Sequence, residues 1–274
     1  APAATTGRAA LADAPLVELP AAAIAEMGSA PEDPVGRVFD PDGTLADEVH
    51  LLPHTAARNR VADEVFAAGA AAFVGRLVNH PLDGHRYYVP YHGEPLPGPG
   101  VWISGDDGAR LHDLLAAGPV RIRLTVASTS TVVTSRTVVG ELAGADDEIV
   151  MIGSHHDGPW ASAVEDATGI ALVLAQASYW AAVPRAERPH RLRFVLHAGH
   201  MSGSAGQEAF IAEHADDWDR TVLAVHLEHA ALETDASGAG DPERCTPRWF
   251  FTSRLAPLEA TVARTVAEAD LRRS

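Results

Sequence analysis

Histidine and acidic residues gather directly after three apolar runs in the second half of the chain. These clusters lie at residues 154–157, 197–200 and 228–229. One histidine at the end of a strand is more often a core residue than a ligand, but three such clusters favour a shared site. Imidazole and carboxylate together suit zinc, iron and similar divalent ions. The candidate ligands are two imidazoles and two carboxylates: His155, Glu165, His200 and Glu228.

The apolar runs themselves predict the elements that would position these groups. Runs at 148–153, 193–196 and 222–227 are typical of buried strands, and the stretches 168–182 and 207–214 are typical of helices. Strands that alternate with helices indicate an α/β fold with a mostly parallel sheet flanked by helices. Ligands bind beyond the carboxyl ends of such strands, so we expect the three clusters to meet at one edge.

The first and second parts of the chain differ in sequence pattern, and we expect a domain boundary near residue 119. Residues 1–119 are rich in turn signals from proline and glycine, and they predict a smaller β-rich module. From residue 120 the strand and helix patterns alternate, with further strand candidates at 120–126 and 131–142. The predicted domains are therefore 1–119 and 120–274.

Short elements are also expected inside the first module. Residues 62–66 predict a helix, and 71–74 and 101–103 predict short strands. A helix is expected over 109–117, preceded by a capping turn at 104–108.

Composition excludes several classes of protein. The net charge is −16 at pH 7, so nucleic acid, whose phosphates such a surface repels, is not an expected partner. Hydrophobic residues at 46% are ordinary for a globular chain, and no apolar run reaches the length of a membrane-spanning helix. The single cysteine, Cys245, excludes an internal disulfide and a multi-cysteine metal site.

The pattern as a whole resembles a known family. A strand leads into His-x-Asp, a loop follows with an acidic residue four positions before a glycine, and two further strands each lead into polar ligand-type residues. The stretches that carry the pattern are 149–157, 163–169, 193–203 and 224–228. This layout resembles the zinc-dependent aminopeptidases that carry an inserted protease-associated domain. Residues 1–119 resemble that insert, and residues 120–274 resemble the zinc-peptidase core.

The resemblance implies roles for individual residues. It implies that His155 binds a metal ion and that the carboxylate of Asp157 orients this imidazole. Glu165 stands where the family has the aspartate that bridges two metals, and Glu228 stands where a further aspartate completes the shell of the first metal. The metal set implied in this chain is therefore His155, Glu165 and Glu228.

The second metal set of the family is altered here. The family has two adjacent glutamates, a general base and a metal ligand, where this chain has His200 and Met201. A thioether is a poor ligand for such an ion. The family's last histidine ligand lies beyond residue 274, so the resemblance implies a core that is incomplete at its C-terminus. One zinc ion is therefore expected in preference to two, with His200 as general base or as an extra ligand.

These inferences predict a metal-dependent hydrolase that acts on amide or peptide bonds, in the manner of an aminopeptidase, with a degenerate or rebuilt site. The expected partner is a peptide or small amide substrate, and the resemblance favours a secreted protein. Two alternatives stay open at this stage. The chain could be a catalytically inactive binding protein with a peptidase-like fold, or a single-metal enzyme that runs a different reaction.

Overall fold

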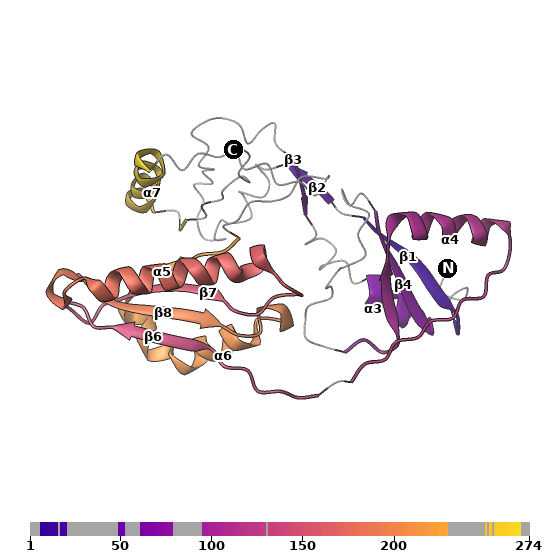
Figure 1. Cartoon of the computed structure of the whole chain (residues 1–274), viewed down its shortest axis with the longest axis horizontal. Helices are drawn as coiled ribbons and strands as arrows, with labels where there is room; N and C mark the ends of the chain where they lie inside the picture. The colour runs from indigo at the N-terminus through magenta and orange to yellow at the C-terminus, as the bar shows by residue number, and fades with distance from the viewer. Residues whose placement is uncertain are drawn as a thin grey trace.

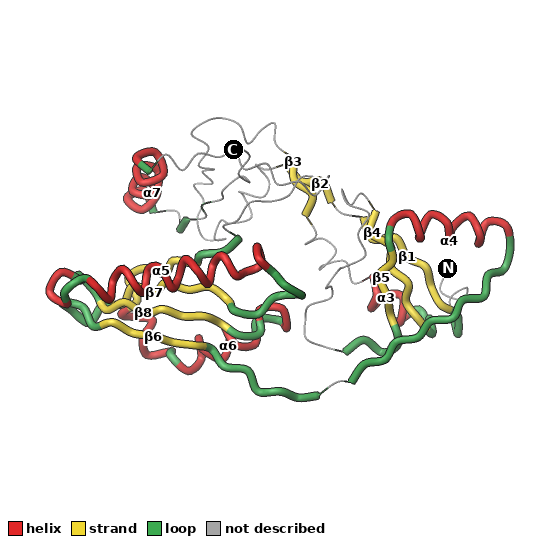
Figure 2. The backbone as a smooth tube through the Cα atoms, in the orientation of Figure 1, coloured by secondary structure: helices red, strands yellow, loops and turns green. Residues whose placement is uncertain are grey.

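The structure is a computed structural model of the chain. It describes residues 6–15, 17–20, 49–52, 61–78, 95–129, 131–229, 250, 252–253 and 255–269; Cys245 lies outside these ranges. The described residues form three separate sheets, which Figure 1 shows in the order of the chain and Figure 2 by type of element. Among the helices of this part of the chain, none combines the length and the apolar character needed to cross a membrane.

The first part of the chain carries two small sheets. Three strands form a parallel sheet in the order β1-β4-β5: β1 (Ala9–Pro15), β4 (Ala72–Val78) and β5 (Gly100–Ile103). Two more strands form an antiparallel pair: β2 (Val17–Pro20) and β3 (Val49–Leu52). The helices of this part are α3 (Val61–Ala67) and α4 (Gly105–Ala117).

Helices α3 and α4 and strands β4 and β5 match the short elements expected from the sequence, whereas β1, β2 and β3 were not predicted. The predicted helix over 109–117 begins earlier, at Gly105, because the hydroxyl of Ser104 caps it by accepting the amide of Asp107 at 3.1 Å. Phe73 is buried in β4, and Trp102 packs edge-on against it with ring centroids 5.2 Å apart. That this part is a protease-associated module stays a prediction.

The second part of the chain contains the mostly parallel sheet that the sequence predicts. Its order is β6-β8-β7-β9, in which β7 pairs in parallel with both β8 and β9. Figure 1 shows helix α5 on one side of this sheet and α6 on the other. The elements are β6 (Val138–Leu142), β7 (Ile149–His155), α5 (Thr168–Ala182), β8 (Arg191–His197), α6 (Ala205–Glu213) and β9 (Thr221–His226). The short helices η2 (Ala163–Ala167), η3 (Arg185–Glu187), η4 (His200–Ser202) and η5 (Ala215–Arg220) and the helix α7 (Ala256–Glu268) complete this part.

Two predicted strands are wrong in part. The segment 120–126 has no strand, and of the candidate 131–142 only β6 forms. Here β6 pairs antiparallel with β8, whereas the described residues before it have no neighbouring strand to complete their backbone hydrogen bonds. Their apolar side chains stay in solvent, with Ile122 45% and Val133 77% exposed. An alternating pattern stabilises a strand only where a partner strand and a core are within reach.

The sheet is held by different interactions on its two faces. Leu192 and Phe194 of β8 pack with Val173 of α5 in an apolar cluster. On the other face, Arg193 is 6% exposed and forms ion pairs with Glu141 of β6 at 2.6 Å and Asp217 of η5 at 2.7 Å. Both faces fix the strands beneath the carboxyl edge, where the polar clusters lie.

Candidate metal centre

The carboxyl ends of three strands meet at one edge of the sheet. In the register, His155 at the end of β7 lies opposite His197 at the end of β8, and Gly153 lies opposite His226 at the end of β9. The sequence clusters that follow these strands are therefore neighbours in space, as the parallel arrangement requires.

His155 is the most buried of the four candidate ligands, with 1% of its side chain exposed. Its Nδ1 lies 2.7 Å from the backbone carbonyl of Asp157. A carbonyl oxygen can only accept, so Nδ1 carries the proton in the neutral ring and Nε2 keeps a free lone pair. This buried Nε2 has no hydrogen-bond partner among the described residues. An imidazole held in this way is oriented as a metal ligand is.

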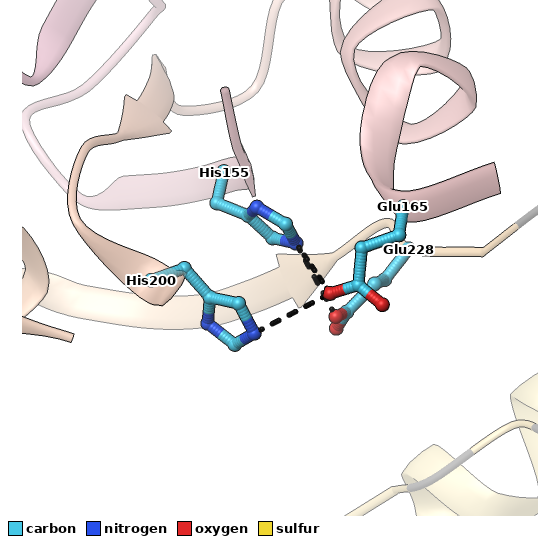
Figure 3. A group of neighbouring side chains, drawn as sticks. All are labelled: His155, Glu165, His200 and Glu228. Carbon is cyan, nitrogen blue, oxygen red and sulfur yellow. Dashed lines mark ion pairs between the residues drawn. The ribbon is translucent and has the colours of Figure 1, made fainter. Parts of the chain in front are cut away.

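Two carboxylates face the bare nitrogen of His155 (Figure 3). Its Nε2 lies 3.5 Å from Oε1 of Glu228 and 3.7 Å from Oε1 of Glu165. Nε2 of His200 lies 3.8 Å from the same Glu165 oxygen. These distances exceed those of ordinary hydrogen bonds, and they are near the separation of about 3.3 Å between ligand atoms around a tetrahedral zinc ion.

The structure thus brings all four candidate ligands together. One ligand atom from each of His155, Glu165, His200 and Glu228 lies within 4.8 Å of the others. Two nitrogens and two carboxylate oxygens at such distances fit a divalent ion. The four candidate ligands predicted from the sequence therefore lie together in the structure.

Charge at the site follows from these contacts. Burial alone would lower the pKa of His155, but Glu228 and the carbonyl of Asp157 raise it above its ordinary value. Contact with His155 and then His226 holds the pKa of Glu228 well below its usual range. Burial would raise the pKa of Glu165, yet the neighbouring His229 lowers it. Both carboxylates are therefore ionised at neutral pH, as metal ligands must be.

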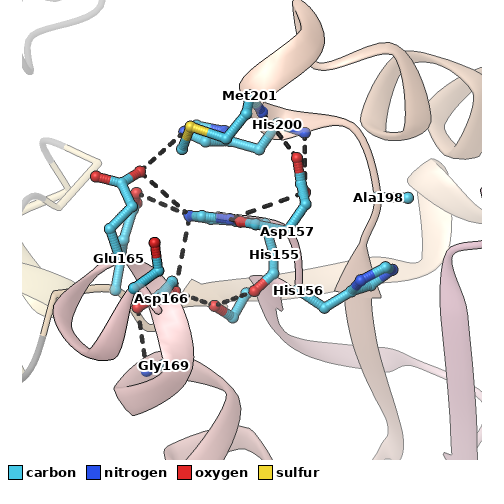
Figure 4. Close-up of polar contacts among 12 residues, drawn as sticks. His155, His156, Asp157, Glu165, Asp166, Gly169, Ala198, His200 and Met201 are labelled. Carbon is cyan, nitrogen blue, oxygen red and sulfur yellow. Dashed lines mark hydrogen bonds and ion pairs between the residues drawn. The ribbon is translucent and has the colours of Figure 1, made fainter. Parts of the chain in front are cut away.

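Asp157 contacts His155 differently from what the sequence predicts. Its backbone carbonyl, and not its carboxylate, accepts from Nδ1; the carboxylate oxygen Oδ1 lies 4.0 Å away. The carboxylate instead accepts the backbone amides of His200 at 3.1 Å and Met201 at 2.9 Å (Figure 4). Asp157 therefore orients the imidazole through its main chain and anchors the η4 turn through its side chain.

Asp166 is a structural residue of the site that the sequence analysis did not single out. It is 3% exposed, and its carboxylate accepts from the Ser154 hydroxyl and from the amides of Gly169 and His229, each amide at 3.1 Å. A Cβ on Gly169 would lie 2.2 Å from Asp166 Oδ2 and 2.4 Å from the carbonyl of Leu227. In the sequence, the spacing of Glu165 four positions before Gly169 was the signal for this contact, because Asp166 lies between these two residues.

His200 lies flat against His155. Their ring centroids are 4.1 Å apart and their planes differ by 22°. Burial, followed by the neighbouring His155, lowers the pKa of His200. A neutral imidazole can accept a proton or bind an ion through its lone pair, so the geometry is compatible with either of the predicted roles.

A second group of potential ligands lies away from the site and in solvent. Nδ1 of His190 lies 3.1 Å from Asp146 and 3.3 Å from Glu148. Both carboxylates are exposed, and the arrangement is that of ordinary surface ion pairs. His190 is therefore a suitable control for substitutions at the candidate metal centre.

The sequence of the second part of the chain matches a known family. Residues 137–271 match the model of the family described as peptidase family M28. This segment is thus similar to peptidase family M28. The match covers the whole sheet β6-β8-β7-β9 and every residue of the candidate metal centre, which confirms the resemblance to the zinc exopeptidases. No curated protein matches the chain.

One solved structure has a similar fold, and a second is similar at a lower TM-score. A peptidase M28 precursor from Shewanella amazonensis SB2B has a TM-score of 0.51 and 21% identity, and the match covers 82% of this chain and 46% of that one. A zinc aminopeptidase from Bacillus subtilis has a TM-score of 0.47 and 18% identity over 62% of this chain and 41% of that one. The chain thus spans less than half the length of either structure.

Proposed function

We propose that the protein is a metal-dependent hydrolase of peptide or amide bonds, in the manner of an aminopeptidase, with one rebuilt ion site. His155, Glu165 and Glu228 would hold the ion. The observation that carries this proposal is the bare Nε2 of His155, which is buried and faces two ionised carboxylates at 3.5 and 3.7 Å. An unpartnered buried nitrogen is costly, and an ion bound there would remove the cost.

Zinc is the ion that this set of donors favours. Imidazole nitrogen with carboxylate oxygen is a common zinc set, and three protein ligands leave a position for water. When bound, the ion would act as a Lewis acid and lower the pKa of its water. The match to peptidase family M28 supports a metal-dependent hydrolase, and the donor set present here is one that suits zinc.

His200 would act as the general base or as a fourth ligand. It occupies the position directly after β8 and Gly199, where the peptidases resembled here have the base glutamate. Its Nε2 points toward Glu165 Oε1 at 3.8 Å, and its ring is neutral because burial lowers its pKa. As a base it would take a proton from the attacking water; Asp157 would hold the turn that carries it.

The substrate we propose is a peptide or a small aminoacyl amide. The family match supports an amide bond as the reacting group, and the strong negative charge of the chain argues against nucleic acid as a substrate.

Hydrolysis of aminoacyl and dipeptidyl p-nitroanilides tests this proposal. The full chain should release p-nitroaniline, lose this activity after treatment with a chelator and recover it when zinc is restored. The variant His190→Ala should behave as wild type throughout. A protein that binds zinc but cleaves none of these amides would contradict the proposed reaction.

A further inference from the structure

Each of the two metal-facing carboxylates is contacted by a different histidine on its other oxygen. Glu165 turns Oε1 toward His155 and Oε2 toward His229, whose Nε2 lies at 3.1 Å. Glu228 turns Oε1 toward His155 and Oε2 toward His226, whose Nε2 also lies at 3.1 Å. The two carboxylates thus share one arrangement, with an inner oxygen at the candidate ion position and an outer oxygen on a histidine.

The inner and outer contacts differ in kind. The outer pairs lie within hydrogen-bonding distance, at which an imidazole N–H interacts favourably with a carboxylate oxygen. The inner pairs, at 3.5 and 3.7 Å, are too long for that and leave room for an ion between the atoms. Nε2 of His229 also lies 3.5 Å from the inner oxygen of Glu228, but its shorter contact, at 3.1 Å, is with the outer oxygen of Glu165. An imidazole nitrogen that presents its N–H to a carboxylate has no lone pair to offer a metal, so neither outer histidine is arranged as a ligand.

The backbone fixes both outer histidines. His226 ends β9, and Glu228 follows two positions later, so both side chains leave the chain on the same side. His229 has a φ of 53°, a left-handed conformation unusual for a residue other than glycine. Its amide donates to Asp166 Oδ1 at 3.1 Å, which holds it there.

We propose that His226 and His229 are positioning residues of the metal centre, an inference that rests on the proposed function. Each occupies the outer oxygen of one carboxylate and so keeps the inner oxygen of Glu228 or Glu165 directed at the ion. Without this contact a glutamate side chain can rotate or bind through both oxygens, and the site loses its preformed geometry. Groups that hold metal ligands in this way commonly determine affinity for the ion.

Zinc affinity of matched variants tests the proposal. The variants His226→Leu and His229→Leu remove the donor, whereas His226→Gln and His229→Gln keep an amide N–H near the same place. His190→Leu is the control, because His190 also pairs with carboxylates but lies outside the site. Zinc dissociation constants would be measured by competition with a chelator, and the visible spectrum of the cobalt-substituted protein would report ligand geometry. Thermal unfolding of the metal-free variants would show that each is folded.

The leucine variants should bind zinc about 10- to 100-fold more weakly than wild type and change the cobalt spectrum. The glutamine variants should stay close to wild type in both. Leucine variants with wild-type affinity and spectrum would overturn the inference while leaving the proposed function intact. Equal losses in the leucine and glutamine variants would also overturn it and would make the histidines ligands. A wild-type protein that binds no zinc would overturn the inference together with the proposed function.

Discussion

The imidazole of His200 stacks on the imidazole of His155, with ring centroids 4.1 Å apart. This stacking places His200, in the short helix η4 after β8, beside His155 at the end of β7. It directs Nε2 of His200 toward Glu165. His200 would need this position both as a general base and as a ligand of the ion, so substitutions are needed to distinguish the two roles.

Replacement of His200 by alanine and by glutamate separates these two roles. If His200 is the base, His200→Ala should keep the metal and lower kcat by roughly 10²- to 10⁴-fold, whereas His200→Glu should retain activity. If His200 is a ligand, zinc affinity should fall together with activity in both variants. Zinc content and kcat, measured on the same preparations, decide between them. Full activity with full zinc content in His200→Ala would exclude both roles.

The side chain of Asp157 gives a second prediction. Because its carboxylate anchors the amides of His200 and Met201 while its carbonyl orients His155, Asp157→Ala should free the η4 turn without turning the imidazole of His155. We expect a large fall in kcat and a zinc dissociation constant close to wild type. Loss of zinc in this variant would contradict a His200 that acts only as the base, and would show that the carboxylate of Asp157 supports a ligand, either His200 through the turn or His155 directly.

Asp166 should be important for stability. Its buried carboxylate accepts from three donors, and each donor left unpaired costs about 1–3 kcal/mol. Asp166→Ala should therefore lower the free energy of unfolding by about 3 kcal/mol or more, and Asp166→Asn, which keeps one oxygen, by less. Urea unfolding followed by circular dichroism measures both. Asp147→Ala, at a position exposed to solvent, is the control; an Asp166→Ala protein as stable as this control would refute the assignment.

His197 should make stability depend on pH. Burial, followed by the nearby histidines, lowers its pKa to about 4, against an ordinary value of 6.5. Between these values the unfolded chain binds a proton that the folded protein does not, so stability is lost as the pH falls from 6.5 toward 4. At pH 5 this loss is about 2 kcal/mol.

The variant His197→Leu tests this prediction. Leucine fills a similar volume against Phe210 and does not titrate, and Nδ1 of His197 has no hydrogen-bond partner to lose among the residues that the structure describes. The urea midpoint of the variant should therefore fall less between pH 7 and pH 5 than that of wild type. Parallel pH profiles of the two proteins would contradict the prediction.

Much of the second sheet could be predicted from the sequence, because its strands and helices differ in local pattern. Helix α5 begins and ends at the predicted residues, and β7, β8 and β9 form where buried strands are predicted. The strand predicted at 120–126 failed because strand formation depends on a partner that a local pattern does not reveal.

The composition of the site was predictable, whereas its supporting contacts were not. The family resemblance pointed to His155, Glu165 and Glu228 as residue types at fixed spacings. The use of a carbonyl by Asp157, the buried acceptor Asp166 and the outer contact of His229 depend on where separate segments approach each other. Such contacts follow from the fold and cannot be derived from spacing alone.

The central claim is that the bare nitrogen of His155 belongs to a metal site. The most direct test is the zinc content of the purified chain, measured by elemental analysis after dialysis against zinc, for wild type, His155→Ala and His190→Ala. We expect about one ion per chain in wild type and in His190→Ala, and none in His155→Ala, because the loss of one of three ligands is seldom tolerated. Equal zinc content in wild type and His155→Ala would contradict it.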